Sequence, residues 1–151
     1  WEEFKSYCCK INLCFSEDKE YLFEMASQLQ VEHQLRLLGS VSEGEKSWYY
    51  RNCRAFVAPS LAEGFCMPVT EAMSIGKPLF LSNRTALPEI GGNTAFYFPD
   101  FHPDLLQRVY HEGMHRYTLD GMKEKIVERS NSFCWKKSAE QYISVYQSLL
   151  D

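Results

Sequence analysis

The stretch that decides the fold is residues 59–92, which read PSLAEGFCMPVTEAMSIGKPLFLSNRTALPEIGG. It follows a short apolar run at 55–59, turns at Gly64, enters a helical segment at Pro68 and leaves it at Gly76. Proline is favoured at the start of a helix, and glycine is favoured just past its end. A second apolar run follows at 78–81, so the stretch predicts a strand, a helix and a strand in succession.

The same alternation extends in both directions along the chain. Short apolar runs at 11–15, 35–38 and 95–98 predict further buried strands. A helical stripe follows residue 18, made of Tyr21, Leu22, Met25, Ala26 and Leu29. Ser42 and Glu45 have the spacing of a capping box, which opens a helix that runs to about Cys53.

The last third of the chain predicts helices alone. The final helix carries one apolar face, made of Ala139, Tyr142, Ile143, Tyr146, Leu149 and Leu150. Buried strands alternating with helices indicate an α/β protein, with a Rossmann-like parallel sheet covered by helices on both faces.

Length and composition limit the function. The 151 residues (17.6 kDa) are enough for one compact domain, which we expect to span 1–151. A net charge of −4 gives no electrostatic footprint for nucleic acid, and no apolar run is long enough for a transmembrane segment. The six cysteines contain no C-x-x-C pair, so free thiols in a reducing, cytoplasmic compartment are expected.

Two carboxylates flank the turn between the strand at 55–59 and the helix after it. Parallel sheets bind ligands where strand ends lead into helix N-termini, so this loop is the first candidate site. Gly64 admits close approach of a ligand, and outward N–H groups at 66–70 suit a diphosphate. Glu71 is placed to accept hydrogen bonds from a vicinal diol such as a ribose, and Glu63 to reach hydroxyls beyond the phosphates. Spacing alone leaves open that Glu63 is merely solvated and that Glu71 merely favours the helix dipole.

The run at 59–92 resembles the donor-binding signature of retaining GT-B glycosyltransferases (glycosyltransferase family four, or group 1), which include glycogen synthase and bacterial mannosyltransferases. The family pattern is a strand ending in Pro-Ser, then E-G-F-G-x-P-x-x-E-A-M-x-x-G-x-P-V, then a segment ending in P-E. The resemblance extends upstream through 38–42 and the helix carrying Tyr50, and downstream to 132–135. It implies the C-terminal half of a GT-B fold, which binds a nucleotide-diphosphate sugar as donor and transfers the sugar with retention of configuration, without an obligatory metal.

The resemblance also implies a role for each position of the motif. Glu71 matches the residue that holds the nucleotide ribose, and Glu63 takes the catalytic position, close to the reacting carbon of the donor sugar. The other donor-binding positions are Gly64, Phe65, Cys66, Met67, Pro68 and Val69. No cofactor is expected, because the nucleotide sugar is itself a substrate. The acceptor is expected to be a glycan, a lipid or a protein.

The chain departs from the family pattern in two places. Cys66 stands where the family has the second glycine of G-F-G, and a side chain there would crowd the donor. Residues 1–4 look like the end of a helix that follows the family's first strand and its Arg- and Lys-bearing loop. We therefore expect that strand, that loop and the N-terminal acceptor domain to belong to a longer cytoplasmic enzyme. We expect this chain alone to be inactive, with any membrane contact made through the missing domain.

Three other functions need to be weighed. A non-catalytic GT-B-like binding or assembly module would also show Cys66 and lack the basic pair. H-E-x-x-H at 111–115 is the pattern of a zinc hydrolase, but helical spacing puts His111 and His115 on the solvent side, and Gly113 weakens the helix. A dinucleotide oxidoreductase would need G-x-G-x-x-G after a strand, and the sequence has none. No metal ligand is therefore predicted.

Overall fold

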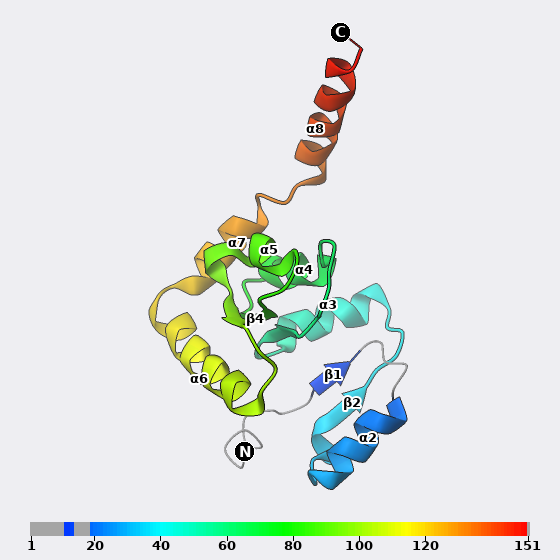
Figure 1. The fold of residues 1–151 in the computed structure, drawn as a ribbon, viewed down its shortest axis with the longest axis vertical. Helices are drawn as coiled ribbons and strands as arrows, with labels where there is room; N and C mark the ends of the chain where they lie inside the picture. The colour runs from blue at the N-terminus through cyan, green and yellow to red at the C-terminus, as the bar shows by residue number, and fades with distance from the viewer. Residues whose placement is uncertain (1–10, 14–18, 151) are drawn as a thin grey trace. The chain divides into compact units, whose positions relative to one another are not determined.

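The computed structural model describes residues 11–13 and 19–150, with side chains from Glu20 onward (Figure 1). The chain divides into two compact units, residues 1–49 and residues 50–151. The single nucleotide-sugar-binding domain expected over 1–151 stays a prediction. Residues 1–4, on which the expectation of a missing first strand rests, lie outside the described residues.

The first unit contains a two-stranded parallel sheet. Strand β1 (Ile11–Leu13) pairs with β2 (Leu35–Leu37). Between these strands lie α2 (Lys19–Gln28) and the 3₁₀ helix η1 (Glu32–Gln34). Parallel strands need a crossover connection of this kind. Both strands and the helix between them are confirmed, although residues 14–15 of the expected first strand are not among those described.

Helix α3 (Glu43–Asn52) begins at the expected capping box. The Ser42 hydroxyl and the Ser42 N–H both donate to Glu45 Oε2, at 2.7 and 2.9 Å. In return, the Glu45 N–H donates to Ser42 Oγ at 3.3 Å. These bonds favour the charged carboxylate and lower the pKa of Glu45. The predicted capping box at the start of this helix is thus confirmed.

The second unit is built on a three-stranded parallel sheet in the order β3–β4–β5. The strands are β3 (Phe56–Ala58), β4 (Leu79–Ser82) and β5 (Phe96–Phe98). All four residues of the central strand β4 are buried. Such a strand needs cover on both faces, which is why its sequence is a continuous apolar run rather than an alternating one. The predicted strands agree with the observed ones to within one or two residues.

Helices supply the cover on both faces (Figure 1). Phe80 and Leu81 are neighbours on β4 and therefore point to opposite faces. On the Phe80 face lies α6 (Pro103–Leu119), whose Tyr110 ring centroid is 4.9 Å from that of Phe80. On the Leu81 face lies α5 (Leu87–Gly91), a short helix that the sequence analysis did not anticipate. The predicted α/β fold, with a parallel sheet between helices, is confirmed.

A glycine lets α6 approach the sheet closely. A Cβ atom at Gly113 would lie 2.6 Å from Phe80 Cε1 and 2.7 Å from Phe96 Cγ. Real side chains do not tolerate such contacts, so packing requires glycine here despite its low helix propensity.

Two further helices complete the core of the second unit. Helix α4 (Met67–Ser74) contacts α5, β3 and β4, and α7 (Met122–Ser130) packs against α4. Their fully or nearly fully buried side chains are Val69, Ala72 and Met73 from α4, and Met122 and Ile126 from α7. This packing fixes α4 firmly, and α4 carries half of the expected site residues.

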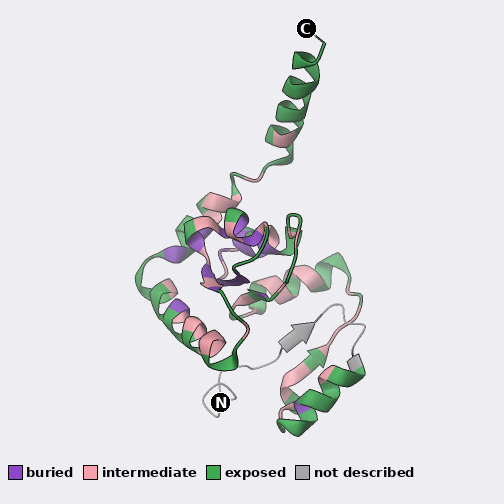
Figure 2. Ribbon diagram, viewed as in Figure 1, coloured by how far each residue is buried: buried purple, intermediate pink, exposed green. Residues whose placement is uncertain are grey.

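The C-terminal helix α8 (Trp135–Ser148) has no buried residue, as Figure 2 shows. The expected apolar face is present, with Tyr142 at 64%, Tyr146 at 61% and Leu149 at 77% exposure. Within the second unit, this face does not join the core. Among the helices of the described residues, none is long and apolar enough to cross a membrane.

Candidate functional site

The expected site lies where β3 and β4 end. Because the two strands are parallel neighbours, residues 59–66 after β3 and residues 83–86 after β4 leave the same edge of the sheet. The two strand ends are joined by the hydroxyl of Ser82, which is fully buried and donates to the main-chain oxygen of Ser60 at 2.5 Å. This bond fixes the base of the loop that carries Glu63.

Glu63 is half-buried and held at two points. The Ser60 hydroxyl donates to Glu63 Oε1 at 2.7 Å, which orients the carboxylate. The Glu63 N–H donates to Thr85 Oγ1 at 2.9 Å, which ties the main chain to the loop after β4. Thr85 has φ +45°, a left-handed conformation that is rare for a β-branched residue. Such outliers cluster where a structure positions groups for a ligand.

Cys66 precedes α4 and has φ +65° and ψ +69°. This left-handed conformation explains why glycine is usual at this position in the family pattern, since only glycine adopts it without cost. Burial, together with the nearby Glu63 carboxylate, raises the pKa of the Cys66 thiol to about 11. The thiol therefore stays protonated at neutral pH and is not a nucleophile there.

The main-chain donors at the start of α4 are fewer than the sequence suggested. Pro68 has no N–H, and the Val69 N–H donates to the main-chain oxygen of Cys66 at 3.0 Å. Of the amides at 66–70, at most those of Cys66, Met67 and Thr70 remain for an anion. The first turn of α4 thus uses the Val69 amide itself, and the anion-binding role expected of the remaining amides stays a prediction.

Glu71 lies one turn into α4 and is half-buried. The hydroxyl of Tyr50, near the end of α3, donates to Glu71 Oε2 at 2.8 Å. The family motif includes the helix that carries Tyr50, but no pattern in the sequence assigns this residue a role. Glu63 and Glu71 are therefore both ordered carboxylates, each with a hydroxyl donor, rather than freely solvated side chains.

The other predicted donor-binding residues differ in their exposure. Gly64, Phe65, Met67 and Pro68 are exposed, whereas Cys66 is half-buried. The Phe65 ring lies edge-on to that of Phe133, with centroids 5.6 Å apart. Val69 is fully buried in the core, so its side chain packs against the protein. The donor-binding roles of these residues stay predictions.

The zinc-hydrolase pattern lies on α6. His111, Glu112 and His115 are all exposed, as the helical spacing predicts. Within the described residues, no group of three His, Cys, Asp or Glu side chains could hold a metal ion. The pattern at 111–115 thus provides no third ligand and no enclosed site in that part of the chain.

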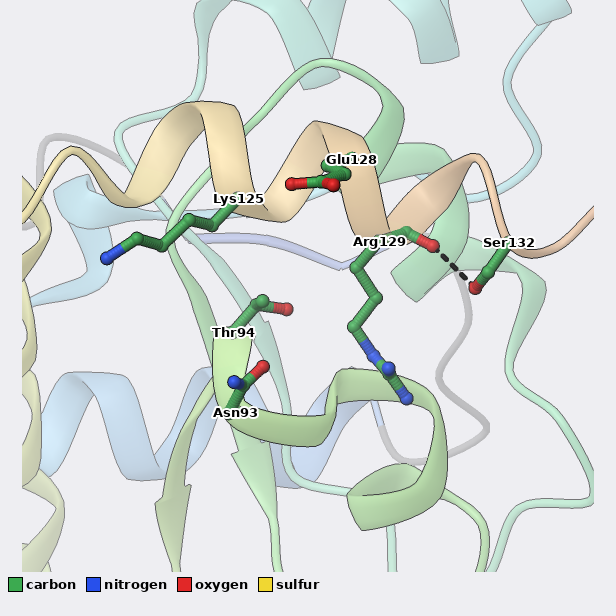
Figure 3. Close-up of a pocket in the computed structure, with 6 residues that line it drawn as sticks. All are labelled: Asn93, Thr94, Lys125, Glu128, Arg129 and Ser132. Carbon is green, nitrogen blue, oxygen red and sulfur yellow. Dashed lines mark hydrogen bonds between the residues drawn. The ribbon is translucent and has the colours of Figure 1, made fainter.

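A polar recess of about 320 Å³ lies elsewhere in the second unit (Figure 3). It is lined by Asn93, Thr94, Lys125, Glu128, Arg129 and Ser132, from the 3₁₀ helix η2 (Gly92–Thr94), α7 and the turn after α7. None of the predicted donor-binding residues lines it. Its central side chain, Arg129, donates from Nε to the main-chain oxygen of Ile90 at 2.7 Å and from a terminal nitrogen to that of Glu89. The guanidinium thus binds carbonyls of α5, which is a structural role.

Comparison with known proteins decides the family. The sequence matches the profile described as glycosyl transferases group 1 over residues 11–109. The chain belongs to this family. It is similar to the O-antigen chain mannosyltransferase B of Escherichia coli, with 29% identity over 136 residues, covering 87% of this chain and 35% of that protein. The chain spans about a third or less of the length of the curated relatives that it matches.

Solved structures of glycosyl transferases share the fold. The sucrose-phosphate synthase of Thermosynechococcus elongatus superposes with a TM-score of 0.71 at 21% identity, covering 87% of this chain and 34% of that one. The pneumococcal O-GlcNAc transferase in complex with UDP and GlcNAc superposes with a TM-score of 0.67 at 19% identity, covering 88% and 28%. The predicted family and the Rossmann-like fold of a GT-B glycosyltransferase are thus confirmed.

Proposed function

We propose that this chain is the donor-binding part of a longer, retaining glycosyltransferase, which binds a nucleotide-diphosphate sugar without a metal or a cofactor. One observation carries the proposal. In a member of the glycosyl transferases group 1 family, Glu63 and Glu71 lie on either side of the start of α4, each fixed by a hydroxyl donor. A carboxylate that is already held in this way loses little conformational freedom when a ligand hydroxyl binds to it. Less of the binding free energy is therefore spent on ordering the side chain.

The proposed roles follow the chemistry of the donor. Glu71 accepts the two hydroxyls of the ribose alongside its bond from Tyr50, since the two oxygens of a carboxylate together have about four acceptor positions. The amides of Cys66 and Met67 donate to the diphosphate at the positive end of α4. Glu63 contacts the hydroxyls of the transferred sugar, next to the carbon at which the bond breaks.

Catalysis in this scheme depends on the leaving diphosphate. Negative charge grows on it as the bond to the sugar breaks, and fixed N–H donors and basic side chains stabilise that charge. We assign the basic side chains and the acceptor site to the rest of the enzyme, since the chain covers only about a third of the length of these two curated relatives. This division predicts weak donor binding and no transfer by the chain alone, in a cytoplasmic enzyme.

Relatives support the class of donor but leave its base open. One relative is named as a mannosyltransferase, and one structural neighbour was solved with UDP and GlcNAc. The acceptor, whether a glycan, a lipid or a protein, is likewise assigned to the remaining part of the enzyme.

Saturation-transfer NMR tests the proposal, because it detects weak binding. The 151-residue chain is measured with UDP-glucose, GDP-mannose and ADP-glucose, and its folding is verified by circular dichroism. We expect a signal from one nucleotide, strongest on its ribose protons, that is lost in Glu71→Ala. Glu112→Ala, which removes an exposed carboxylate from α6, is the matched control and should leave the signal unchanged. Silence from all three nucleotides, or equal signals from Glu71→Ala and the unmodified chain, would refute the proposal.

A second function is favoured by one residue. The half-buried Cys66 side chain stands where the family pattern has glycine, as a non-catalytic binding or assembly module would allow. The variant Cys66→Gly separates the two functions. If the chain is a module that has lost donor binding because of this side chain, the unmodified chain gives no saturation-transfer signal, and Cys66→Gly binds a nucleotide. A donor-binding domain gives the signal with Cys66 in place.

A further inference from the structure

A half-buried side chain of α3, that of Tyr50, reaches the proposed donor site. The Tyr50 hydroxyl and the Glu71 carboxylate are 21 residues apart in sequence and form a partly buried hydrogen bond of 2.8 Å. Hydrogen bonds to a charged acceptor are stronger than neutral ones. This bond restricts rotation of the carboxylate about its terminal torsion, which is otherwise broad for glutamate.

The donor side of this bond is itself rigid. The Tyr50 ring packs on Phe56 of β3, with ring centroids 5.9 Å apart, and both residues pack against the core of the second unit. The segment just after Tyr50 is clamped by Lys77, whose Nζ donates to the main-chain oxygens of Arg51 and Cys53 at 2.8 Å each. Lys77 directly follows the turn that ends α4, so one lysine ties the end of α3 to the helix that carries Glu71.

We infer that Tyr50 is a positioning residue for donor binding, which holds the Glu71 carboxylate in the orientation that accepts the vicinal diol of a nucleoside diphosphate. The inference rests on the proposed function, since it assigns Tyr50 to the same site. Tyr50 acts through Glu71, so its removal should reduce the benefit that the ribose 2′-hydroxyl gives to binding. A merely structural tyrosine would weaken binding of ribose and deoxyribose nucleotides equally.

The experiment measures affinity by NMR titration for three pairs of nucleotides: UDP and dUDP, GDP and dGDP, and ADP and dADP. The variant Tyr50→Phe removes one oxygen and keeps the ring on Phe56. Its matched control is Tyr117→Phe, which also loses one partly buried hydroxyl bond, from Tyr117 to the main-chain oxygen of Gly76 at 2.7 Å, beyond the other end of α4. Tyr50→Phe is also made in the Glu71→Ala background.

We expect Tyr50→Phe to weaken binding of the preferred ribose nucleotide about 3- to 10-fold and binding of its 2′-deoxy counterpart, which keeps only the 3′-hydroxyl, by a smaller factor, so that the preference for ribose shrinks. Tyr117→Phe should alter neither affinity. In the Glu71→Ala background, Tyr50→Phe should have no further effect, because the group that it positions is gone.

The outcomes separate the inference from the proposed function. If Glu71→Ala weakens binding but Tyr50→Phe behaves like Tyr117→Phe, the positioning role is wrong and the proposed function stands. If Tyr50→Phe weakens both members of a pair equally, Tyr50 is structural and the inference falls as well. If the folded chain binds none of the six nucleotides, the proposed function fails, and the inference fails with it.

Discussion

Each end of α4 is followed or preceded by a residue with positive φ, but the two residues are of different types. Beyond its C-terminal end, Gly76 has φ +74°, and just before its N-terminal end, Cys66 has φ +65°. Glycine takes this conformation without penalty, whereas a residue with a Cβ atom pays ~1 kcal/mol. One end of the helix thus avoids a strain that the other end retains.

The surroundings of the two ends explain the difference. Gly76 is buried, its N–H donates to the Met73 oxygen, and its own oxygen accepts the Tyr117 hydroxyl. Cys66 is only half-buried and stands beside Glu63, in a loop whose neighbours include exposed Phe65 and Met67. The C-terminal end is therefore shaped by packing. The N-terminal end tolerates strain at an open edge of the sheet, which is where a ligand would bind.

The largest expected effect is at the packed end. In Gly76→Ala, the new Cβ would meet Lys123 Cγ at 2.6 Å and Val127 Cγ2 at 3.1 Å, in addition to the cost of the left-handed backbone. We expect the free energy of unfolding to fall by about 2–4 kcal/mol, as measured by urea denaturation. The control is Gly64→Ala at the open end, where a Cβ has no neighbour within 4 Å, and which should change stability by about 0.5 kcal/mol or less. Equal losses of unfolding free energy in Gly76→Ala and Gly64→Ala would contradict the difference in packing between the two ends of α4.

The next largest effect is at Cys66 itself. Cys66→Val places a β-branched side chain at φ +65° and should cost about 1–2 kcal/mol of unfolding free energy. Cys66→Gly relieves the strain but gives the unfolded chain more freedom, so it should stay within about 1 kcal/mol of the unmodified chain. A valine variant as stable as the glycine variant would show that this end carries no strain.

The smallest effect concerns thiol chemistry and leaves stability unchanged. With its pKa raised to about 11, Cys66 holds about 100-fold less thiolate at pH 8 than a cysteine of ordinary pKa 9.0. Cys134, at the start of α8, is exposed, and main-chain N–H groups of Lys137 and Lys136 lower its pKa. Among the three cysteines that the structure describes, we therefore expect iodoacetamide to label Cys134 first. Labelling of Cys66 should be slow and should rise about tenfold per pH unit from pH 8 to 10.

Peptide mass spectrometry measures both labelling rates in one sample. Cys53, whose pKa is also raised by burial, is the control for slow labelling of a half-buried thiol. Fast labelling of Cys66 at pH 8 would mean that the thiol is not half-buried beside Glu63 as described.

Local signals in the sequence were enough to predict much of this structure. The apolar runs located the strands, Ser42 and Glu45 formed the expected capping box, and the motif at 59–92 placed the candidate carboxylates on the loop and the helix after β3. Each of these features depends on residues a few positions apart. Side-chain periodicity and helix capping operate on that scale.

The remainder depends on contacts between distant residues. Three hydrogen bonds join residues that are 21 or 22 positions apart: Tyr50 to Glu71, Ser82 to Ser60, and Glu63 to Thr85. No local sequence pattern predicts them. Gly113 is another example, because only the approach of α6 to Phe80 and Phe96 shows why it must be glycine. The left-handed backbone at Cys66 could not be predicted either, because cysteine has no preference for positive φ.

The most direct test of the proposed site is to map where a nucleotide binds. In a ¹⁵N-labelled chain titrated with UDP, GDP or ADP, we expect the amide shifts to change at residues 60–67 and 83–86 and at Glu71, while Gly76 and Lys77 stay still. Such a result would place the ligand at the strained end of α4. Changes centred on Asn93, Thr94 and Arg129 instead, or none with any of the three nucleotides, would contradict a donor site at this end of the helix.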